Sequence, residues 1–125
     1  MSKILFVIEF GGFSLPLEDF RKAGHEVEFA KNMRKAVSLL NKMQPDLLAA
    51  EFNYTSQFRD RDSNLDTILT QIESRSPHTR VVAFVEEEQR PHFERFKSRF
   101  PQIQGELYFP FESDNLLSLV DVVLQ

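Results

Sequence analysis

Two acidic residues stand where short apolar runs of the sequence end. Glu9 closes the run 3–9, and Glu51 lies near the end of the run 46–52. If these runs are neighbouring buried strands, the two carboxylates meet out of water. Each then makes the other harder to ionise, and burial adds to that cost. The pair therefore needs protonation, rotation into solvent or a cationic partner.

Other chemically capable side chains do not converge in the sequence. The three histidines, His25, His78 and His92, fit no zinc motif such as HExxH, so we expect surface histidines. Residues 86–88 are glutamates that precede an expected helix and complement its positive N-terminus, in preference to binding a cation. Gly11-Gly12 lacks the patterns GxGxxG and GxxxxGK[ST] of nucleotide-binding loops. We predict no metal, no cofactor and no catalytic residues.

The composition is that of an ordinary globular chain, with 125 residues, 42% hydrophobic residues and a formal charge of −4. This length suits one domain over residues 1–125. The negative charge argues against a nucleic-acid binder. The absence of Cys excludes disulfides and thiol catalysis and favours the cytosol. The longest apolar runs, 4–8 and 81–85, are far below the roughly 20 residues that span a bilayer, so no membrane role is expected.

Short apolar runs alternate with amphipathic segments along the whole chain. Strands are predicted over 3–9, 25–29, 46–52, 81–85 and 105–109. Helices are predicted over 15–23 before Gly24, from Asn32 to Met43, from Ser63 or Asn64 to the Pro77 region, from Pro91 with Phe93, Phe96 and Phe100 inward, and from Ser113 or Asp114 onward.

This alternation predicts an α/β fold built from right-handed βαβ units. The count and the lengths suit one doubly wound, five-stranded parallel sheet of order 2-1-3-4-5, the flavodoxin-like arrangement. Ligands of such sheets bind at the carboxyl ends of the strands. A ligand site is therefore expected among the residues just after Val7, Ala50, Val85 and Tyr108.

Taken in order, five segments resemble the receiver domain of bacterial response regulators, of which CheY is a member. They are Ile4–Glu9, Ala23–Val27, Pro45–Glu51, Val81–Val85 and Phe109–Phe111. The resemblance covers essentially the whole chain. It implies that the Phe109–Pro110 peptide is cis, as the matching Lys-Pro bond typically is in receivers.

The residues that carry out phosphotransfer in receivers are replaced here. The acidic pair that holds Mg²⁺ becomes Ile8 and Glu9, and the phosphoacceptor Asp becomes Glu51. The hydroxyl position is Val85, and the Lys position before Pro110 is Phe109. The aromatic switch position, three residues before that Lys, is Glu106, with Tyr108 the nearest aromatic residue.

Phosphoryl transfer to a carboxylate needs a metal and a cation to neutralise charge. Ile8, Val85 and Phe109 supply neither, so we expect no ordinary phosphotransfer to Glu51. Two interpretations stay open: Glu9 and Glu51 are inert carboxylates at a partly wet rim, or Glu51 imitates a phosphorylated Asp.

Two further features border this pocket. The segment 53–63 contains Arg59 and Arg61, one of which, or a backbone N–H of the segment, is predicted to approach Glu51. The alternative is that both arginines pair with Asp60, Asp62 or water at the surface. Four phenylalanines, Phe10, Phe13, Phe109 and Phe111, either plug the pocket, which we favour, or form a patch for a partner.

We therefore interpret the chain as a stand-alone, degenerate receiver-like domain that is no enzyme and acts without phosphorylation. By resemblance, it binds a protein partner through the fourth helix, fifth strand and fifth helix, and a homodimer is also allowed. The alternative is a small-ligand-binding or enzymatic domain that uses the crevice above strands one and three.

Overall fold

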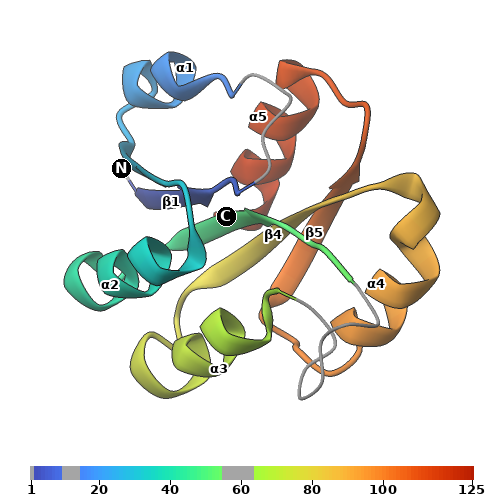
Figure 1. Cartoon of the computed structure of the whole chain (residues 1–125). Helices are drawn as coiled ribbons and strands as arrows, with labels where there is room; N and C mark the ends of the chain where they lie inside the picture. The colour runs from blue at the N-terminus through green and yellow to red at the C-terminus, as the bar shows by residue number, and fades with distance from the viewer. Residues whose placement is uncertain (1, 10–14, 55–63) are drawn as a thin grey trace.

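The computed structural model describes residues 2–9, 15–54 and 64–125 and has one parallel sheet between two layers of helices (Figure 1). The strands are β1 (Lys3–Val7), β2 (Glu26–Ala30), β3 (Leu47–Glu51), β4 (Arg80–Val85) and β5 (Ile103–Tyr108). Their order is β2-β1-β3-β4-β5, and every neighbouring pair is parallel. The predicted fold class and strand order are confirmed.

Five α-helices alternate with these strands in the described part of the chain. They are α1 (Leu17–Lys22), α2 (Met33–Met43), α3 (Asp66–Arg75), α4 (Arg90–Lys97) and α5 (Ser113–Val123), and the short 3₁₀ helix η1 (Glu87–Gln89) precedes α4. Figure 1 shows α1 and α5 on one face of the sheet and α2 and α3 on the other. None of the helices in the described residues has the length and apolar character needed to cross a bilayer.

The strands are buried on both faces, which explains why they read as continuous apolar runs. Along β4, Val81 and Ala83 pack into a core cluster with residues of α2, α3 and α4. The alternate residues Val82 and Phe84 pack into a second cluster with residues of α1 and α5. Because side chains alternate between the faces of a strand, one strand serves both clusters.

Two predicted helix boundaries are confirmed by their local chemistry. Oδ1 of Asn32 accepts a hydrogen bond of 2.8 Å from the Lys35 N–H, so Asn32 is the N-cap of α2. Gly24 follows α1 with a φ of +94°, a left-handed conformation that suits glycine at this position.

Three predicted boundaries are wrong. The N-cap of α3 is Leu65, so Asn64 is not the cap. The N-cap of α5 is Glu112, which forms a capping box with Asn115, in place of Ser113 or Asp114. Helix α4 ends at Lys97, so Phe100 lies beyond it, although its ring still contacts Phe96 at 4.8 Å between centroids.

Candidate functional site

The candidate residues lie along one edge of the sheet, where the parallel strands end. Ile8 and Glu9 follow β1, Glu51 ends β3, Val85 ends β4, and Phe109 and Pro110 follow β5. Since β1 neighbours β3, β3 neighbours β4, and β4 neighbours β5, these ends share the carboxyl edge. The predicted location of the site is therefore reproduced by the fold.

Glu51 is buried, with 6% of its surface exposed, and its side chain accepts a hydrogen bond. Its Oε1 accepts a hydrogen bond of 2.6 Å from the backbone N–H of Glu9. Rotation of Glu51 into solvent is thereby excluded. This donor comes from the second residue after β1. The predicted approach of a donor from the segment 53–63 stays a prediction, because residues 55–63 lie outside the described part of the chain. Arg59 and Arg61 lie outside the described residues.

Asn64 joins the chain after β1 to the end of β3 through its side-chain nitrogen, and its side-chain oxygen binds Asn53. Its Nδ2 donates to Oε1 of Glu9 at 3.2 Å and to the carbonyl oxygen of Glu51 at 2.9 Å. Its Oδ1 accepts from the Asn53 N–H at 2.7 Å, and its own N–H donates to the Asn53 carbonyl at 3.2 Å. Asn64 thus ties together three residues at the carboxyl edge.

Sequence reasoning missed this role of Asn64 because an Asn before a helix is also the usual mark of an N-cap. A usable signal was present, however. The polar segment after β3 starts at Asn53 and is followed by Asn64, so an amide stands at each end of it. Amides can donate and accept at once, which suits an edge that holds carboxylates and carbonyls.

Aromatic rings crowd the edge beside β4 and β5. The rings of Phe84 and Phe111 have centroids 5.3 Å apart, and those of Phe109 and Phe111 are 5.2 Å apart. Ile8, 8% exposed, belongs to the same core cluster as Phe84. Phe109 and Phe111 therefore fill space near the pocket, as the plug hypothesis requires, whereas Phe10 and Phe13 lie outside the described residues.

Two candidate residues stand apart from this aromatic group. Val85 is fully buried in the other core cluster, with residues of α3 and α4, so it does not share a face with Phe109. Pro110 is exposed. The peptide between Phe109 and Pro110 is cis, as predicted.

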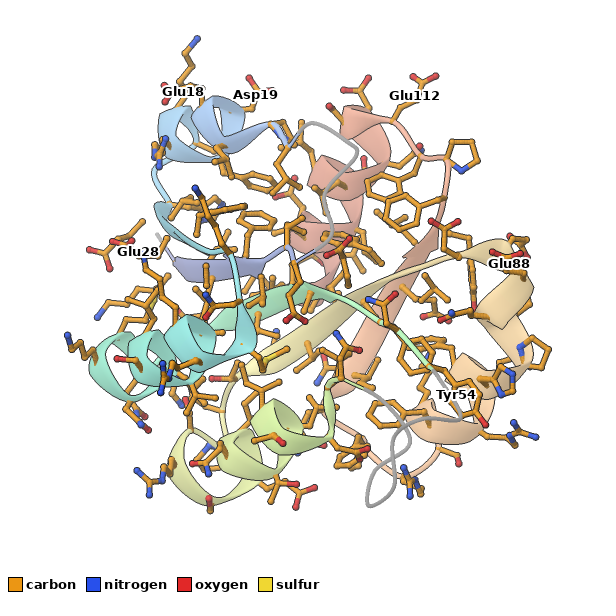
Figure 2. All side chains as sticks on the ribbon, in the orientation of Figure 1. Glu18, Asp19, Glu28, Tyr54, Glu88 and Glu112 are labelled. Carbon is orange, nitrogen blue, oxygen red and sulfur yellow. The ribbon has the colours of Figure 1, made fainter. Side chains whose placement is uncertain are left out.

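Tyr54, three residues after the end of β3, contacts Gln89 in η1 and His92 in α4. The Tyr54 N–H donates to Oε1 of Gln89 at 3.1 Å, and its ring stacks on His92 with centroids 3.8 Å apart. In Figure 2, Tyr54 lies beside α4. The guanidinium of Arg95 in turn contacts Nδ1 of His92 at 2.7 Å. His92 therefore belongs to a packing contact between this loop and α4.

Glu106, at the aromatic switch position, is held by a lysine. Nζ of Lys97 in α4 donates to both carboxylate oxygens of Glu106 in β5, at 3.1 and 2.9 Å. Two residues further along β5, the guanidinium of Arg90 lies 3.6 Å from the centre of the Tyr108 ring. Burial raises the pKa of Tyr108 above its ordinary value, against a smaller opposing effect of Arg90.

The described residues do not fit a receiver-type Mg²⁺ site. Mg²⁺ requires six oxygen ligands in near-octahedral geometry. Ile8 offers no ligand, and one carboxylate oxygen each of Glu9 and Glu51 already accepts an N–H. Among residues 2–9, 15–54 and 64–125, no group of three or more His, Cys, Asp or Glu side chains is placed to hold a metal ion.

The chain was compared with protein-family models, curated proteins and solved structures. No protein-family model matches the chain, and no curated protein matches it significantly. Solved structures do match. The chemotaxis protein CheY4 of Vibrio cholerae is 21% identical, with a TM-score of 0.72 over 98% of both chains.

Two further solved structures agree. A response regulator receiver domain protein of Clostridium thermocellum is 17% identical, with a TM-score of 0.74 over 99% of this chain and 94% of that one. A member of a family of streptococcal redox sensors, described as evolved from two-component response regulators, is 16% identical, with a TM-score of 0.77 over 99% of this chain and 51% of its own. The chain therefore has the fold of CheY-like receiver domains.

Proposed function

We propose that this chain, which has the receiver-domain fold, is a signalling or adaptor module that binds a protein partner and works without phosphorylation or enzymatic activity. The observation that carries the proposal is the state of Glu51. This residue occupies the phosphoacceptor position, yet it is 6% exposed and its Oε1 already accepts the Glu9 N–H. Ile8, Val85 and Phe109 supply none of the groups that phosphotransfer needs.

The partner surface that we propose is the face of α4, β5 and α5. Val122 of α5 is 64% exposed, and it is the large apolar side chain that the described part of the chain leaves exposed. Helix α4 has three basic residues and one acidic residue, whereas α5 has two acidic residues and no basic one. A partner with the opposite arrangement of charge would be complementary. A second copy with α4 facing α5 would also satisfy this pattern, so a homodimer remains within the proposal.

This face carries an ion pair at the position where receivers carry a switch residue. Lys97 and Glu106 form an ion pair across α4 and β5, with 36% and 24% of their side chains exposed. Because Glu106 occupies the switch position, no aromatic side chain there can move inward or outward. We infer that the surface is presented in one state, which suits an adaptor that needs no signal to bind.

The same proposal covers the cellular setting. We propose a cytoplasmic protein that uses no cofactor and binds neither nucleic acid nor membrane. The net charge of −4 supports this, because nucleic acid and the anionic membrane surface both attract basic proteins. In Figure 2 the labelled acidic residues Glu18, Asp19, Glu28, Glu88 and Glu112 point outward, and each is exposed.

The alternative, a small-ligand or enzymatic site in the crevice above β1 and β3, has less support. Such sites need converging polar groups in an open pocket. At this edge Ile8, Phe109 and Phe111 pack into or against a core cluster. Asn64 already satisfies Glu9 and two backbone carbonyls.

The proposed partner surface is tested by affinity capture from the native host with matched surface variants. Val122→Lys adds one positive charge on α5, and Ser74→Lys adds the same charge at an exposed position on α3. We expect the wild type and Ser74→Lys to capture the same protein and Val122→Lys to lose it. Prior incubation of the bait with acetyl phosphate should leave the captured amount unchanged.

Two results would count against the proposal. Capture that is equal for all three baits would place the partner on another surface. Capture that requires acetyl phosphate would contradict phosphorylation-independent binding.

A further inference from the structure

Oxygen atoms from two residues meet at the side-chain amide of Asn64, at the carboxyl edge of the sheet, and a third accepts the backbone N–H of Asn64. Nδ2 of Asn64 lies 3.2 Å from the carboxylate of Glu9 and 2.9 Å from the carbonyl oxygen of Glu51. The backbone N–H of Asn64 lies 3.2 Å from the carbonyl oxygen of Asn53. All three contacts are hydrogen bonds that Asn64 donates.

Such a group of oxygens needs a positive partner. Carboxylate and carbonyl oxygens repel one another when they converge, and burial increases the cost because water no longer separates them. Hard divalent cations are the partners that carboxylates and backbone carbonyls commonly bind in proteins. A cation at such a point would neutralise the oxygens and also join the chain segments that carry them.

The N–H groups of Asn64 join the chain segments that carry these oxygens, and they add no net charge. They join Glu9, the second residue after β1, to the end of β3 and to Asn53 beyond it. Oδ1 of Asn64 also accepts the Asn53 N–H at 2.7 Å, which fixes the orientation of the amide. Nδ2 of Asn64 therefore lies where a cation would contact both the Glu9 carboxylate and the Glu51 carbonyl oxygen.

We propose that Asn64 is an internal substitute for a divalent cation, and that it both fastens the ends of β1 and β3 and excludes a metal from this edge. This inference rests on the proposed function and deepens it, because it explains how the edge keeps one arrangement without a phosphoryl group. Asn64 is a positioning residue in this account, since it acts on Glu9 and Glu51.

The sharpest test is Asn64→Asp, which replaces the Nδ2 donor with a second carboxylate oxygen facing Glu9. The variant keeps the acceptor for the Asn53 N–H. In EDTA we expect its Tm to lie below that of the wild type, because oxygens now face oxygens. Millimolar Mg²⁺ or Mn²⁺ should raise that Tm by about 3 °C or more, since a ligand that binds only the folded state stabilises it. The Tm of the wild type should not respond.

Asn32→Asp is the matched control. It makes the same amide-to-acid change at the exposed N-cap of α2, where Oδ1 accepts the Lys35 N–H. Aspartate caps a helix as well as asparagine does, so we expect neither a loss of Tm nor a response to Mg²⁺. A response of this control equal to that of Asn64→Asp would overturn the inference, because it would show a general effect of added charge.

A second variant and a second measurement are used in case Asn64→Asp does not fold in EDTA. Asn64→Ala removes the donors without adding a charge, and Mn²⁺ binding is followed by electron paramagnetic resonance. We expect Mn²⁺ to bind Asn64→Ala at least about tenfold more tightly than the wild type, a difference of about 1.4 kcal/mol. If neither Asn64 variant gains affinity, or if the wild type binds Mn²⁺ equally well, the inference is wrong. Partner capture does not depend on this result, so the proposed function can fail or hold separately.

Discussion

The backbone N–H of Glu9 donates a hydrogen bond of 2.6 Å to the carboxylate of Glu51, which joins the second residue after β1 to the last residue of β3. These two strands are neighbours in the sheet. A carboxylate bound in this way serves the fold as a hydrogen-bond acceptor. The hydrogen bond thus explains how an acidic residue is retained where only 6% of it is exposed.

This relationship predicts different effects for two substitutions of Glu51. Glu51→Gln keeps an oxygen that accepts the Glu9 N–H, so we expect a change of less than about 1 kcal/mol in the free energy of unfolding. Glu51→Ala leaves that N–H without its acceptor, and we expect a loss of about 1–3 kcal/mol. Urea unfolding of the three proteins measures both values. Equal losses in the two variants would mean that the charge of Glu51, and not its acceptor oxygen, stabilises the fold.

A second prediction concerns the contact of α5 with β5. A Cβ atom on Gly105 would lie 2.9 Å from Cδ1 of Leu119, which is closer than carbon atoms pack. Because Leu119 is partly buried and its methyl groups can shift, Gly105→Ala should cost about 1 kcal/mol through overpacking. Leu119→Ala removes the obstructing methyl groups, so the double variant should lose at least about 0.5 kcal/mol less than the sum of the single losses. Strict additivity would show that the backbone moves and that Leu119 is not the obstacle.

The ion pair between α4 and β5 gives a third prediction. Lys97 reaches both oxygens of Glu106, but the two side chains are 36% and 24% exposed, so solvent screens the pair. A double-mutant cycle with Lys97→Met and Glu106→Gln should give a coupling energy of about 0.5–1 kcal/mol at low salt. High salt should reduce that coupling. A coupling energy of zero at low salt would mean that the Lys97–Glu106 ion pair does not stabilise the proposed partner surface.

The fourth prediction concerns pH. The chain has two tyrosines, so Tyr54→Phe leaves Tyr108 as the only phenol. Burial raises the pKa of Tyr108, so its absorbance change should have a midpoint above the ordinary value of about 10. Because the folded pKa is raised, the stability that the neutral phenol contributes is complete below about pH 10 and declines as the pH rises through the folded value. Additional replacement of Tyr108 by Phe should reduce this alkaline loss, and a midpoint at or below about 10 would contradict the prediction.

Much of the fold could be predicted because its signals are local. Continuous apolar runs indicate buried strands, and the Asn32 cap and Gly24 mark helix ends within a few residues. The contacts at the site join distant parts of the chain. Asn64 meets Glu9 across 55 positions of sequence, and Tyr54 meets Gln89 across 35. No local pattern specifies these pairs, so an Asn that resembles a helix cap turned out to fasten two strands.

The position of Glu51 was predictable, but its partner was not. The resemblance to receiver domains located Ile8, Glu9, Glu51 and Phe109 at one edge, and the sheet confirms that placement. The donor that the described residues supply to Glu51 is the backbone N–H of Glu9, and every residue except proline has such a group, so side-chain types could not identify it.

The central claim is that this receiver-like edge does not take up a phosphoryl group. The most direct measurement is the intact mass of the protein after incubation with acetyl phosphate and Mg²⁺, beside Glu51→Gln and a phosphorylatable receiver domain in the same buffer. We predict no mass gain for the wild type or for Glu51→Gln, while the receiver domain gains one phosphoryl group. A stable gain of one phosphoryl group in the wild type that is absent from Glu51→Gln would contradict the account.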